Sequence, residues 1–465
     1  MRKQLLQHLL RLGAVLFLVL LAGCDSASSQ AVPTSTPAPS PTATATPDPA
    51  LTGADWTTYH QNNARTGAVA NALDPKQLTQ AWKVRLDGAV YAEPLVVGTH
   101  VIIATEGDTL YALDRQTGQE QWHTNVGSPV PQSTLPCGDI DPLGITGTPV
   151  YDPATKLIFA VAEIKGPAHI LVGVDVDTGQ VKIRRSADIP GMDPRAHQQR
   201  AAQALSQGMV YIAYGGLAGD CSDYRGTVVA AKTDGSGSLL SYRVPTPREG
   251  GIWAPSGPAV DQSGNIYVAV GNGAETSGAW DRSDSILRLS PTLHLEDGFA
   301  PVQWRQENAT DADLGSTGPI LLPGGLIFAD GKSGKGYLLH ANALGGVGGE
   351  ALVASICRSF GGFAASGSQL LVPCTDGLRA FQVGPGARLK ELWHASSGVD
   401  GSPIVGGHTV YSLNPGGTLY ALSIASGNER ARLSVGAVTR FATPTLSGNQ
   451  IFVGTYTGVV AITIS

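Results

Sequence analysis

One pattern of short apolar runs separated by tight turns recurs along most of this 465-residue chain. Its clearest copy occupies residues 89–127 and contains four runs rich in β-branched and aromatic side chains, punctuated by Gly or Asp. Such runs are typical of β-strands and such punctuation is typical of turns, so one copy predicts four antiparallel strands. Four strands make one blade of a β-propeller, and repeated copies predict a ring of blades.

The copies of this pattern indicate how many blades the ring contains. One further copy occupies residues 401–436, and others begin at Gly147, Ser256 and Thr317. Two more copies, near residues 193–250 and 358–396, lack the opening Pro but keep the strand pattern. Seven units are complete, and an eighth stops at residue 465 before its fourth strand. Eight blades are therefore predicted, with seven as the nearest alternative.

The segment 78–86 offers the strand that the last unit lacks. It resembles an isolated fourth strand such as residues 119–127. Pairing it with the truncated unit would complete the eighth blade and remove two open sheet edges. We predict an all-β fold: an eight-bladed β-propeller of four-stranded antiparallel blades, closed by an N-terminal strand in the last blade.

The composition agrees with an all-β chain that forms one folded domain. Charged residues make up 15%, glycine occurs 59 times, and no long amphipathic helical stretch is present. Short strands and tight turns are favoured by such a composition. Because a closed repeat fold takes up a long chain as one unit, residues 51–465 are predicted to be a single propeller domain.

The second half of the clearest copy carries a recognisable pattern. From Leu110 to Trp122 it is Leu-Tyr-Ala-Leu-Asp-x-x-Thr-Gly-x-x-x-Trp, which resembles the PQQ-like repeat of quinoprotein dehydrogenases and their non-enzymatic relatives. Residues 55–67 resemble the segment that precedes the propeller in secreted and lipid-anchored members. The resemblance covers roughly residues 55–465 and implies the propeller architecture; the pattern repeats mainly at positions that pack blades together.

The same resemblance raises the question of cofactors. In the quinoprotein dehydrogenases that this chain resembles, PQQ lies between a tryptophan and a disulfide of adjacent cysteines. A calcium ion there is held by carboxylate and amide groups. This sequence contains no two adjacent cysteines. No catalytic residue of the family is therefore assigned here, and PQQ with calcium is kept only as an alternative.

The first residues predict export and lipid attachment. A basic start is followed by an apolar run at residues 12–22, which is too short to span a bilayer but suits a signal peptide. The Leu-Ala-Gly-Cys sequence ending at Cys24 resembles a bacterial lipobox. We predict a signal peptide over residues 1–23 and a lipidated Cys24 that anchors the chain to the extracytoplasmic face of a bacterial cell membrane. A chance cysteine in an ordinary leader is the alternative.

A linker follows the predicted anchor. Residues 24–50 contain many Pro, Thr and Ser residues and almost no bulky apolar side chains. Such a segment cannot bury enough surface to fold, so it is predicted to be a disordered tether between the membrane and the propeller.

The remaining cysteines predict disulfides. Beyond Cys24 they are Cys137, Cys221, Cys357 and Cys374. An even number in an oxidising compartment favours two disulfides, which four cysteines can form in three ways. Their places in adjacent repeats favour Cys137 with Cys221 and Cys357 with Cys374. No zinc spacing such as Cys-x-x-Cys occurs, so no metal site is predicted.

The charge excludes one class of partner. The formal net charge is −6, and it becomes more negative when the basic residues of the leader are removed. Nucleic-acid binding needs a basic face, which the sequence does not offer. A monomer is predicted, and its partners are expected to be the membrane and an unknown protein or small molecule.

Candidate ligand-binding residues are those that break the repeat. Most inner strands are predicted to open with a small residue and Pro, but a few positions there carry charged or aromatic side chains instead. If all inner strands start at one rim, these side chains converge on an axial funnel. The candidates are Glu93, His197, Arg200, Trp253, Phe360 and Arg440. Such a funnel suits an anionic or aromatic ligand; the alternative is that the side chains pair with each other and plug the axis.

The sequence thus predicts an extracytoplasmic, membrane-anchored propeller lipoprotein with a non-catalytic binding or scaffold role. A PQQ-dependent dehydrogenase that oxidises an alcohol or sugar at an atypical quinone site is the alternative. Recognition of cell-wall glycan through aromatic side chains is a third hypothesis.

Overall fold

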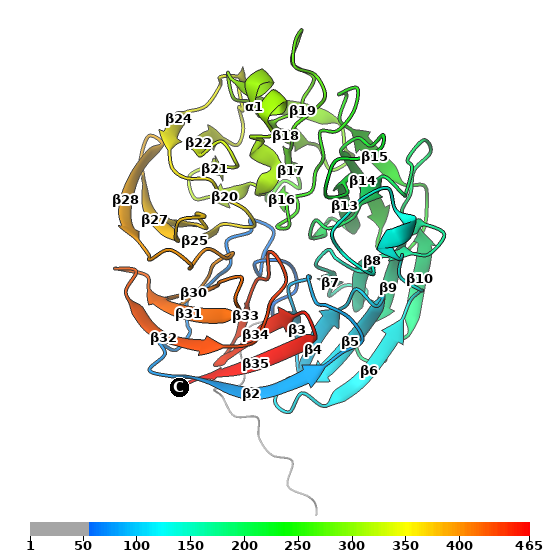
Figure 1. Cartoon of the computed structure of the whole chain (residues 1–465), viewed down its shortest axis with the longest axis vertical. Helices are drawn as coiled ribbons and strands as arrows, with labels where there is room; N and C mark the ends of the chain where they lie inside the picture. The colour runs from blue at the N-terminus through cyan, green and yellow to red at the C-terminus, as the bar shows by residue number, and fades with distance from the viewer. Residues whose placement is uncertain (1–54) are drawn as a thin grey trace, which may run out of the picture. The chain divides into compact units, whose positions relative to one another are not determined.

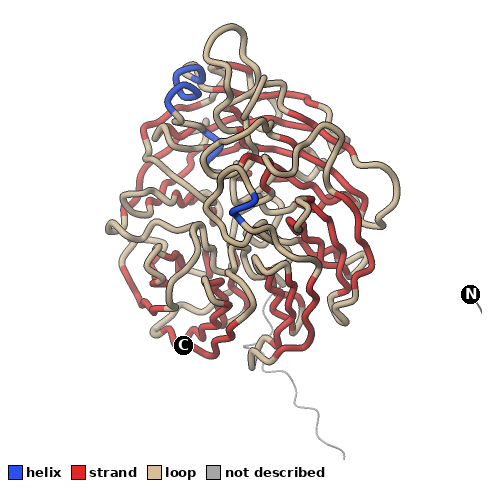
Figure 2. The backbone as a smooth tube through the Cα atoms, turned by 45° about the vertical axis from the view of Figure 1, so that its right-hand side comes forward, coloured by secondary structure: helices blue, strands red, loops and turns tan. Residues whose placement is uncertain are grey.

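Eight β-sheets form the blades of one ring in this computed structural model, which describes residues 55–465. Figure 1 shows the blades following one another around a common axis in chain order, as the predicted all-β propeller requires. Within each blade, consecutive antiparallel strands run from the axis to the outside. Figure 2 shows that strands and loops account for nearly all of the backbone.

The strands of the first four blades have the following bounds. Blade one contains β3 (Leu95–Val97), β4 (His100–Ala104), β5 (Thr109–Asp114) and β6 (Glu120–Asn125). Blade two contains β7 (Val150–Asp152), β8 (Leu157–Ile164), β9 (Ala168–Asp175) and β10 (Val181–Ser186). Blade three contains β12 (Ala204–Ser206), β13 (Met209–Gly216), β14 (Thr227–Lys232) and β15 (Leu240–Arg243), with the short β11 (His197–Gln198) beside β13. Blade four contains β16 (Ala259–Val260), β17 (Ile266–Val270), β18 (Ser285–Leu289) and β19 (Leu295–Ala300), with β23 (Gly346–Val347) added in parallel at its outer edge.

The remaining blades repeat this plan. Blade five contains β20 (Ile320–Leu322), β21 (Leu326–Ala329), β22 (Lys335–His340) and β24 (Leu352–Ser355). Blade six contains β25 (Ala364–Ser366), β26 (Gln369–Val372), β27 (Arg379–Gly384) and β28 (Arg388–His394). Blade seven contains β29 (Ile404–Gly406), β30 (Thr409–Leu413), β31 (Thr418–Ser423) and β32 (Glu429–Ser434), with β1 (Ala68–Val69) parallel to β29. Helical turns are α1 (Trp304–Thr310), η2 (Gln132–Thr134) and η3 (Leu314–Ser316).

The eighth blade confirms the predicted closure. It contains β33 (Thr445–Ser447), β34 (Gln450–Thr455) and β35 (Gly458–Ile464), and its fourth strand is β2 (Leu78–Arg85). The antiparallel pairing runs from Leu78 opposite Ile464 to Arg85 opposite Gly458. Figure 1 shows β2 in blue beside β35 in red. The two segments, far apart in the sequence, thus share one sheet and give the last blade its fourth strand.

The repeated tryptophan and glycine join neighbouring blades. Trp82, Trp122 and Trp393 lie in outer strands and pack on Gly118, Gly179 and Gly427 of the following blade. Gly118 has a φ of +72°, and a Cβ there would lie 2.7 Å from the Trp82 ring. Trp82 Nε1 also donates a hydrogen bond to Arg115 O at 3.1 Å. Only glycine suits this turn, which explains why the Thr-Gly-x-x-x-Trp pattern recurs.

The N-terminal segment Trp56 to Val69 closes one end of the axis. It hydrogen-bonds to the innermost strands of blades one, two and four to seven, through Val96, Tyr151, Val260, Leu321, Ala365, Val405 and the adjoining Gly407. The Asn63 side chain donates to Leu205 O in blade three at 2.8 Å. A segment held by seven inner strands in turn runs around the axis, and its buried Tyr59, His60 and Arg65 side chains fill this end, which we call the closed end.

Candidate functional site

The opposite end of the axis remains open and carries several of the predicted side chains. Arg200, Trp253 and Phe360 each lie a few residues before an innermost strand, as do the neighbours Arg440 and Phe441. These five residues together line one hollow of the surface. We call this group the axial mouth. The repeat-breaking positions of blades three, four, six and eight are therefore brought together.

Guanidinium groups and aromatic rings alternate in the mouth. The Arg200 guanidinium carbon lies 6.0 Å from the Trp253 ring centroid and 5.9 Å from that of Phe441. The rings of Phe441 and Phe360 stack, with centroids 6.4 Å apart and planes at 30°. Arg440 lies over Phe441 at 5.3 Å. Cations at these distances are attracted to ring faces, so the rings orient the two arginines without neutralising their charge.

The two arginines differ in exposure. Arg200 is half-buried, and its Nε donates a hydrogen bond to Trp253 O at 3.0 Å. Burial lowers the pKa of Arg200 from its ordinary value, and the nearby Asp139 carboxylate opposes that shift. The Arg440 side chain is 64% exposed, and its Nη1 lies 3.9 Å from Asp139 Oδ2. A pair this long and exposed contributes little, so Arg440 can bind an anion from solvent.

Phe441 has an unusual backbone conformation. Its φ is +66°, in the left-handed region that bulky residues rarely adopt. The Thr443 hydroxyl donates to Phe441 O at 3.1 Å, and the Tyr59 hydroxyl of the N-terminal segment lies 3.2 Å from Thr443 Oγ1. Strained conformations of this kind persist where surrounding contacts fix them, often at functional sites. The closed end thus helps to hold a ring of the mouth in place.

Three hollows meet at Phe441. The largest, about 370 Å³, lies between blades six, seven and eight. Two smaller ones of about 130 and 190 Å³ lie on the other sides of Phe441 and Arg440, against Tyr91 in one case and Trp253 in the other. The mouth is therefore a divided recess rather than one funnel.

Two predicted members of the funnel lie elsewhere. Glu93 is fully buried below the mouth, where its Oε2 accepts a hydrogen bond from His60 N at 2.8 Å. Its side chain points to the closed end because the His60 amide of the N-terminal segment has Glu93 as its hydrogen-bond acceptor. Burial raises the pKa of Glu93 well above its ordinary value.

His197 is also displaced from the mouth. It pairs within β11, opposite Gly216 of β13, and its ring Nδ1 lies 2.8 Å from Asp193 O. Its ring packs against Tyr224, which separates it from Trp253. His197 therefore does not line the hollow around Arg200 and Trp253, because β11 is an additional strand before the blade's own innermost strand.

The two disulfides have the pairing that the repeat positions favoured. Cys137 is bonded to Cys221, beside the loop that lines the mouth at Leu217 to Asp220. Cys357 is bonded to Cys374, which lies between the cavity-lining residues Pro373 and Thr375. Both disulfides therefore fix loops at the rim of the mouth.

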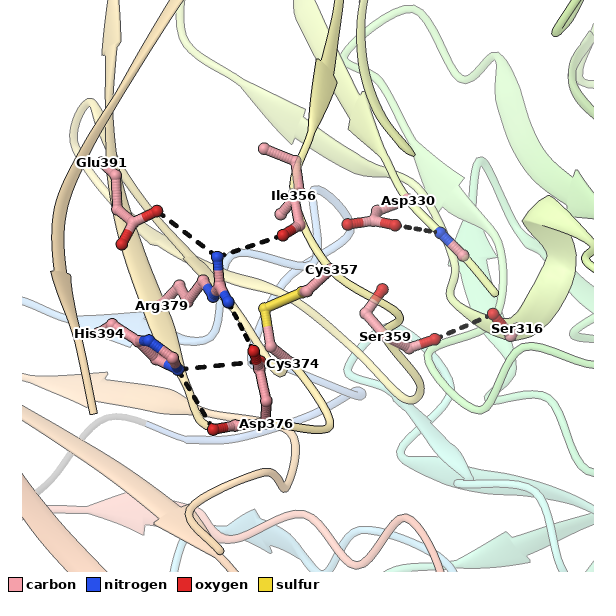
Figure 3. The surroundings of a disulfide bond; sticks show 11 residues. Ser316, Asp330, Ile356, Cys357, Ser359, Cys374, Asp376, Arg379, Glu391 and His394 are labelled. Atoms are coloured by element: carbon pink, nitrogen blue, oxygen red, sulfur yellow. Dashed lines mark hydrogen bonds and ion pairs between the residues drawn. A yellow bond between two sulfur atoms is a disulfide. The ribbon is translucent and has the colours of Figure 1, made fainter. Parts of the chain in front are cut away.

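Figure 3 shows the surroundings of the second disulfide. Ser316 donates a hydrogen bond to Ser359 O at 3.0 Å, which ties blades five and six together near Phe360. Arg379 contacts Asp376 at 2.6 Å and Glu391 at 3.6 Å on the outer side. Arg379 Nη1 also donates a hydrogen bond to Ile356 O at 3.2 Å, so these contacts hold both ends of the loop from Ile356 to Phe360.

A buried carboxylate beside the mouth was not singled out by the sequence. Asp313 is fully buried, and Lys332 Nζ lies 3.2 Å from its Oδ1. Lys332 lines the same hollow as Trp253 and Arg200. Burial raises the pKa of Asp313 to about 6. Its place just before the opening of blade five is the signal that could have identified it.

Comparison with known proteins identifies the family. The family model described as outer membrane protein assembly factor BamB matches residues 67–343 and 376–465. The chain belongs to this family of PQQ-like propellers. No curated protein sequence matches it.

Solved structures with the same fold include both enzymes and a BamB protein. A quinohemoprotein alcohol dehydrogenase from Comamonas testosteroni is 15% identical with a TM-score of 0.67, covering 88% of this chain and 80% of that one. A europium-containing methanol dehydrogenase is 16% identical with a TM-score of 0.68, covering 88% and 90%. BamB from Moraxella catarrhalis is 16% identical with a TM-score of 0.58, covering 83% and 99%. At these identities the likeness shows the PQQ-like propeller fold alone.

The residues of the mouth match only part of what PQQ and calcium require. Trp253 offers a ring face and Lys332 a cation. Residues 55–465 contain no group of three or more His, Cys, Asp or Glu side chains placed to hold one metal ion. Neither disulfide joins adjacent residues. Among the described residues the ring face is therefore present, and the disulfide of adjacent cysteines is not.

Proposed function

We propose that this protein is a membrane-anchored, extracytoplasmic binding protein of the PQQ-like propeller family, without catalytic activity, whose axial mouth binds an anionic ligand. The observation that carries the proposal is the pair of arginines held between aromatic rings at the open end of an axis that is closed at the other. Charge-assisted hydrogen bonds from arginine are among the strongest that a protein offers to an anion.

The packing of the mouth supports binding rather than a plug of mutually paired side chains. Buried charges that serve only structure are paired. Arg440 is mostly exposed, and its nearest carboxylate, on Asp139, is itself 53% exposed. Arg200 and Arg440 repel each other, as the effect of Arg440 on the pKa of Arg200 indicates. An anion placed between them would relieve that repulsion.

The way the chain enters the propeller supports a tethered arrangement. Trp56, close to the start of the described residues, pairs with Val96 at the closed end. Trp56 therefore lies at the opposite end of the axis from the mouth. Cys24 and the rest of the predicted leader and tether lie outside the described residues. Among residues 55–465, no helix is long and apolar enough to cross a membrane.

Ligand binding is tested with a panel of simple anions. Citrate, benzoate, glutamate and glucuronate are titrated into the propeller domain by calorimetry, with Arg440→Gln and Arg200→Gln as variants. Loss of one charge-assisted bond is worth about 1.5–3 kcal/mol, so each variant should bind about 10-fold to 100-fold more weakly. Arg388→Gln, on the exposed outer strand β28, is the matched control. Absence of any arginine-dependent binding would contradict the proposal.

The anchor has its own experiment. Cells expressing the full chain are labelled with palmitate and fractionated, and Cys24→Ser is compared with the natural sequence. We expect label and membrane association in the natural chain and loss of both in the variant. Label that persists after the substitution would disprove lipidation at Cys24.

A PQQ-dependent dehydrogenase that oxidises an alcohol or sugar is the second candidate function. It is favoured by Asp313, a buried carboxylate beside Trp253 whose pKa of about 6 suits a group that accepts a proton near neutral pH. PQQ and calcium are added to the purified protein, and dye reduction is followed over alcohols and sugars. Turnover that disappears in Asp313→Asn would establish this function in place of the first.

A further inference from the structure

We infer that the largest hollow of the mouth is a subsite for a sugar ring that carries a carboxylate. This inference rests on the proposed function, because Arg440 serves as the anion-binding group in both. The hollow lies between blades six, seven and eight and has a volume of about 370 Å³. Pockets for small ligands begin at about 300 Å³, so one or two sugar units would fill it.

Aromatic rings form much of its wall. Phe360 and Phe441 contribute their stacked pair, and Tyr456, which is 48% exposed, stands at the rim. Tyr91 packs edge-on against Tyr456, with centroids 6.3 Å apart, and holds that ring in place. The floor includes Leu413 and other apolar side chains. A ligand therefore needs apolar faces of its own.

Polar groups stand between these rings. Asp400 lines the hollow, and its Oδ1 is buried without a hydrogen-bond partner among the described residues. Asn414 and Thr375 line the same wall. Asn414 is anchored by its Oδ1, which accepts a hydrogen bond from Thr418 N at 2.8 Å. A buried carboxylate oxygen without a partner is costly, so a ligand that donates a hydrogen bond to Asp400 gains affinity.

The combination restricts the chemistry of the ligand. Asp400 requires a donor, Arg440 requires a negative group, and the rings require apolar faces. A fatty acid or an aromatic acid would leave Asp400 unpaired, and an inorganic anion would be repelled by it. A sugar ring supplies hydroxyl donors at its edge and C–H groups on its faces, and its carboxylate pairs with Arg440.

A free amino acid also carries a donor and a carboxylate, but it fits less well. Its ammonium group would pair with the Asp400 carboxylate, which leaves Thr375, Thr439 and Asn414 along the wall without a partner on the ligand. Thr439 already donates its hydroxyl to Val90 O at 3.1 Å, which leaves its oxygen able to accept from a sugar hydroxyl. Several neutral partners spread along one wall match several hydroxyl groups.

Calorimetry on the full-length protein tests the inference with glucuronate, glucose, citrate and phenylalanine. We expect glucuronate to bind at least 10-fold more tightly than glucose or citrate. Arg440→Gln should remove the advantage of glucuronate over glucose. Asp400→Asn should weaken both sugars by at least 5-fold and should not weaken citrate, because the variant removes a negative charge that repels it. Asp234→Asn, in an exposed turn of blade three, is the matched control.

The outcomes separate this inference from the proposed function. Arginine-dependent binding of citrate without any preference for glucuronate would overturn the sugar subsite and leave the proposed function standing. Tightest binding of phenylalanine would replace the sugar with an amino acid. If none of the four compounds binds, the sugar subsite fails, and the anion-binding function fails as well if benzoate and glutamate also do not bind.

Discussion

The two ends of the propeller axis use arginine in opposite ways. At the closed end Arg65 is fully buried and donates hydrogen bonds to Pro258 O, Tyr59 O and Gln203 O and to the Thr58 hydroxyl. At the mouth Arg440 is exposed and lies 3.9 Å from its nearest carboxylate. A cation surrounded by protein acceptors joins blades together, whereas a cation held only by ring faces is available to a ligand.

Replacing each arginine by alanine should give the largest difference between the two ends in the free energy of unfolding. Arg65→Ala leaves buried carbonyl groups of the closed end without donors, which should cost about 3–5 kcal/mol of unfolding free energy. Arg440→Ala should change it by about 0.5 kcal/mol or less, because the side chain is exposed. Urea unfolding followed by circular dichroism measures both. Similar losses for the two variants would remove the distinction between the ends.

The two ends should also respond to pH in opposite directions. Burial lowers the pKa of His60, at the closed end, to about 3. Its folded pKa is below the unfolded value, so its stabilising contribution is lost as the pH falls from about 6.5. Burial raises the pKa of Glu106, at the mouth side of blade one, to about 8. Its contribution is present at low pH and is lost as the pH rises from about 4.5 through 8.

Variants at His60 and Glu106 separate the two contributions to the curve of unfolding free energy against pH. One proton changes the unfolding free energy by up to about 1.4 kcal/mol per pH unit. His60→Gln should flatten the curve between pH 4 and 6 and leave the neutral range unchanged. Glu106→Gln should flatten it between pH 5 and 8 only. Urea midpoints at each pH provide the measurement, and a variant that alters both ranges would contradict the assignment.

The architecture could be predicted because it depends on local packing requirements that are the same in each repeat. Gly118 and Trp82 are needed at fixed places for one blade to pack on the next, so their spacing appears in the sequence. The closing strand β2 was visible because it keeps the pattern of a fourth strand without the other three. The disulfide pairing followed in the same way from neighbouring repeats.

The site was predicted only in part because it depends on contacts that no repeat encodes. Arg200 and Arg440 reach the mouth because each directly precedes an innermost strand. Glu93 has the same sequence position but faces His60, since the N-terminal segment passes beneath it. The path of that segment around seven inner strands has no periodic signal. The path of the N-terminal segment determines which repeat-breaking residues face solvent and which are buried.

The smallest expected change in the free energy of unfolding concerns the backbone conformation of Phe441. Because its φ is +66°, a glycine there relieves strain that an alanine retains. Phe441→Gly should therefore be more stable than Phe441→Ala by about 1 kcal/mol, although both lose the ring. The neighbouring Ala442 does not have a positive φ, so Ala442→Gly should be destabilising by about 0.5–1 kcal/mol.

These two comparisons by urea unfolding test whether the mouth is held in a strained conformation by the closed end. The Tyr59 hydroxyl reaches Thr443, which bonds to the carbonyl of Phe441. In a Tyr59→Phe background, the hydroxyl that fixes Thr443 is missing and the backbone can relax. The advantage of glycine over alanine at position 441 should then shrink. An unchanged advantage would mean that the mouth keeps its conformation independently of the segment that closes the other end.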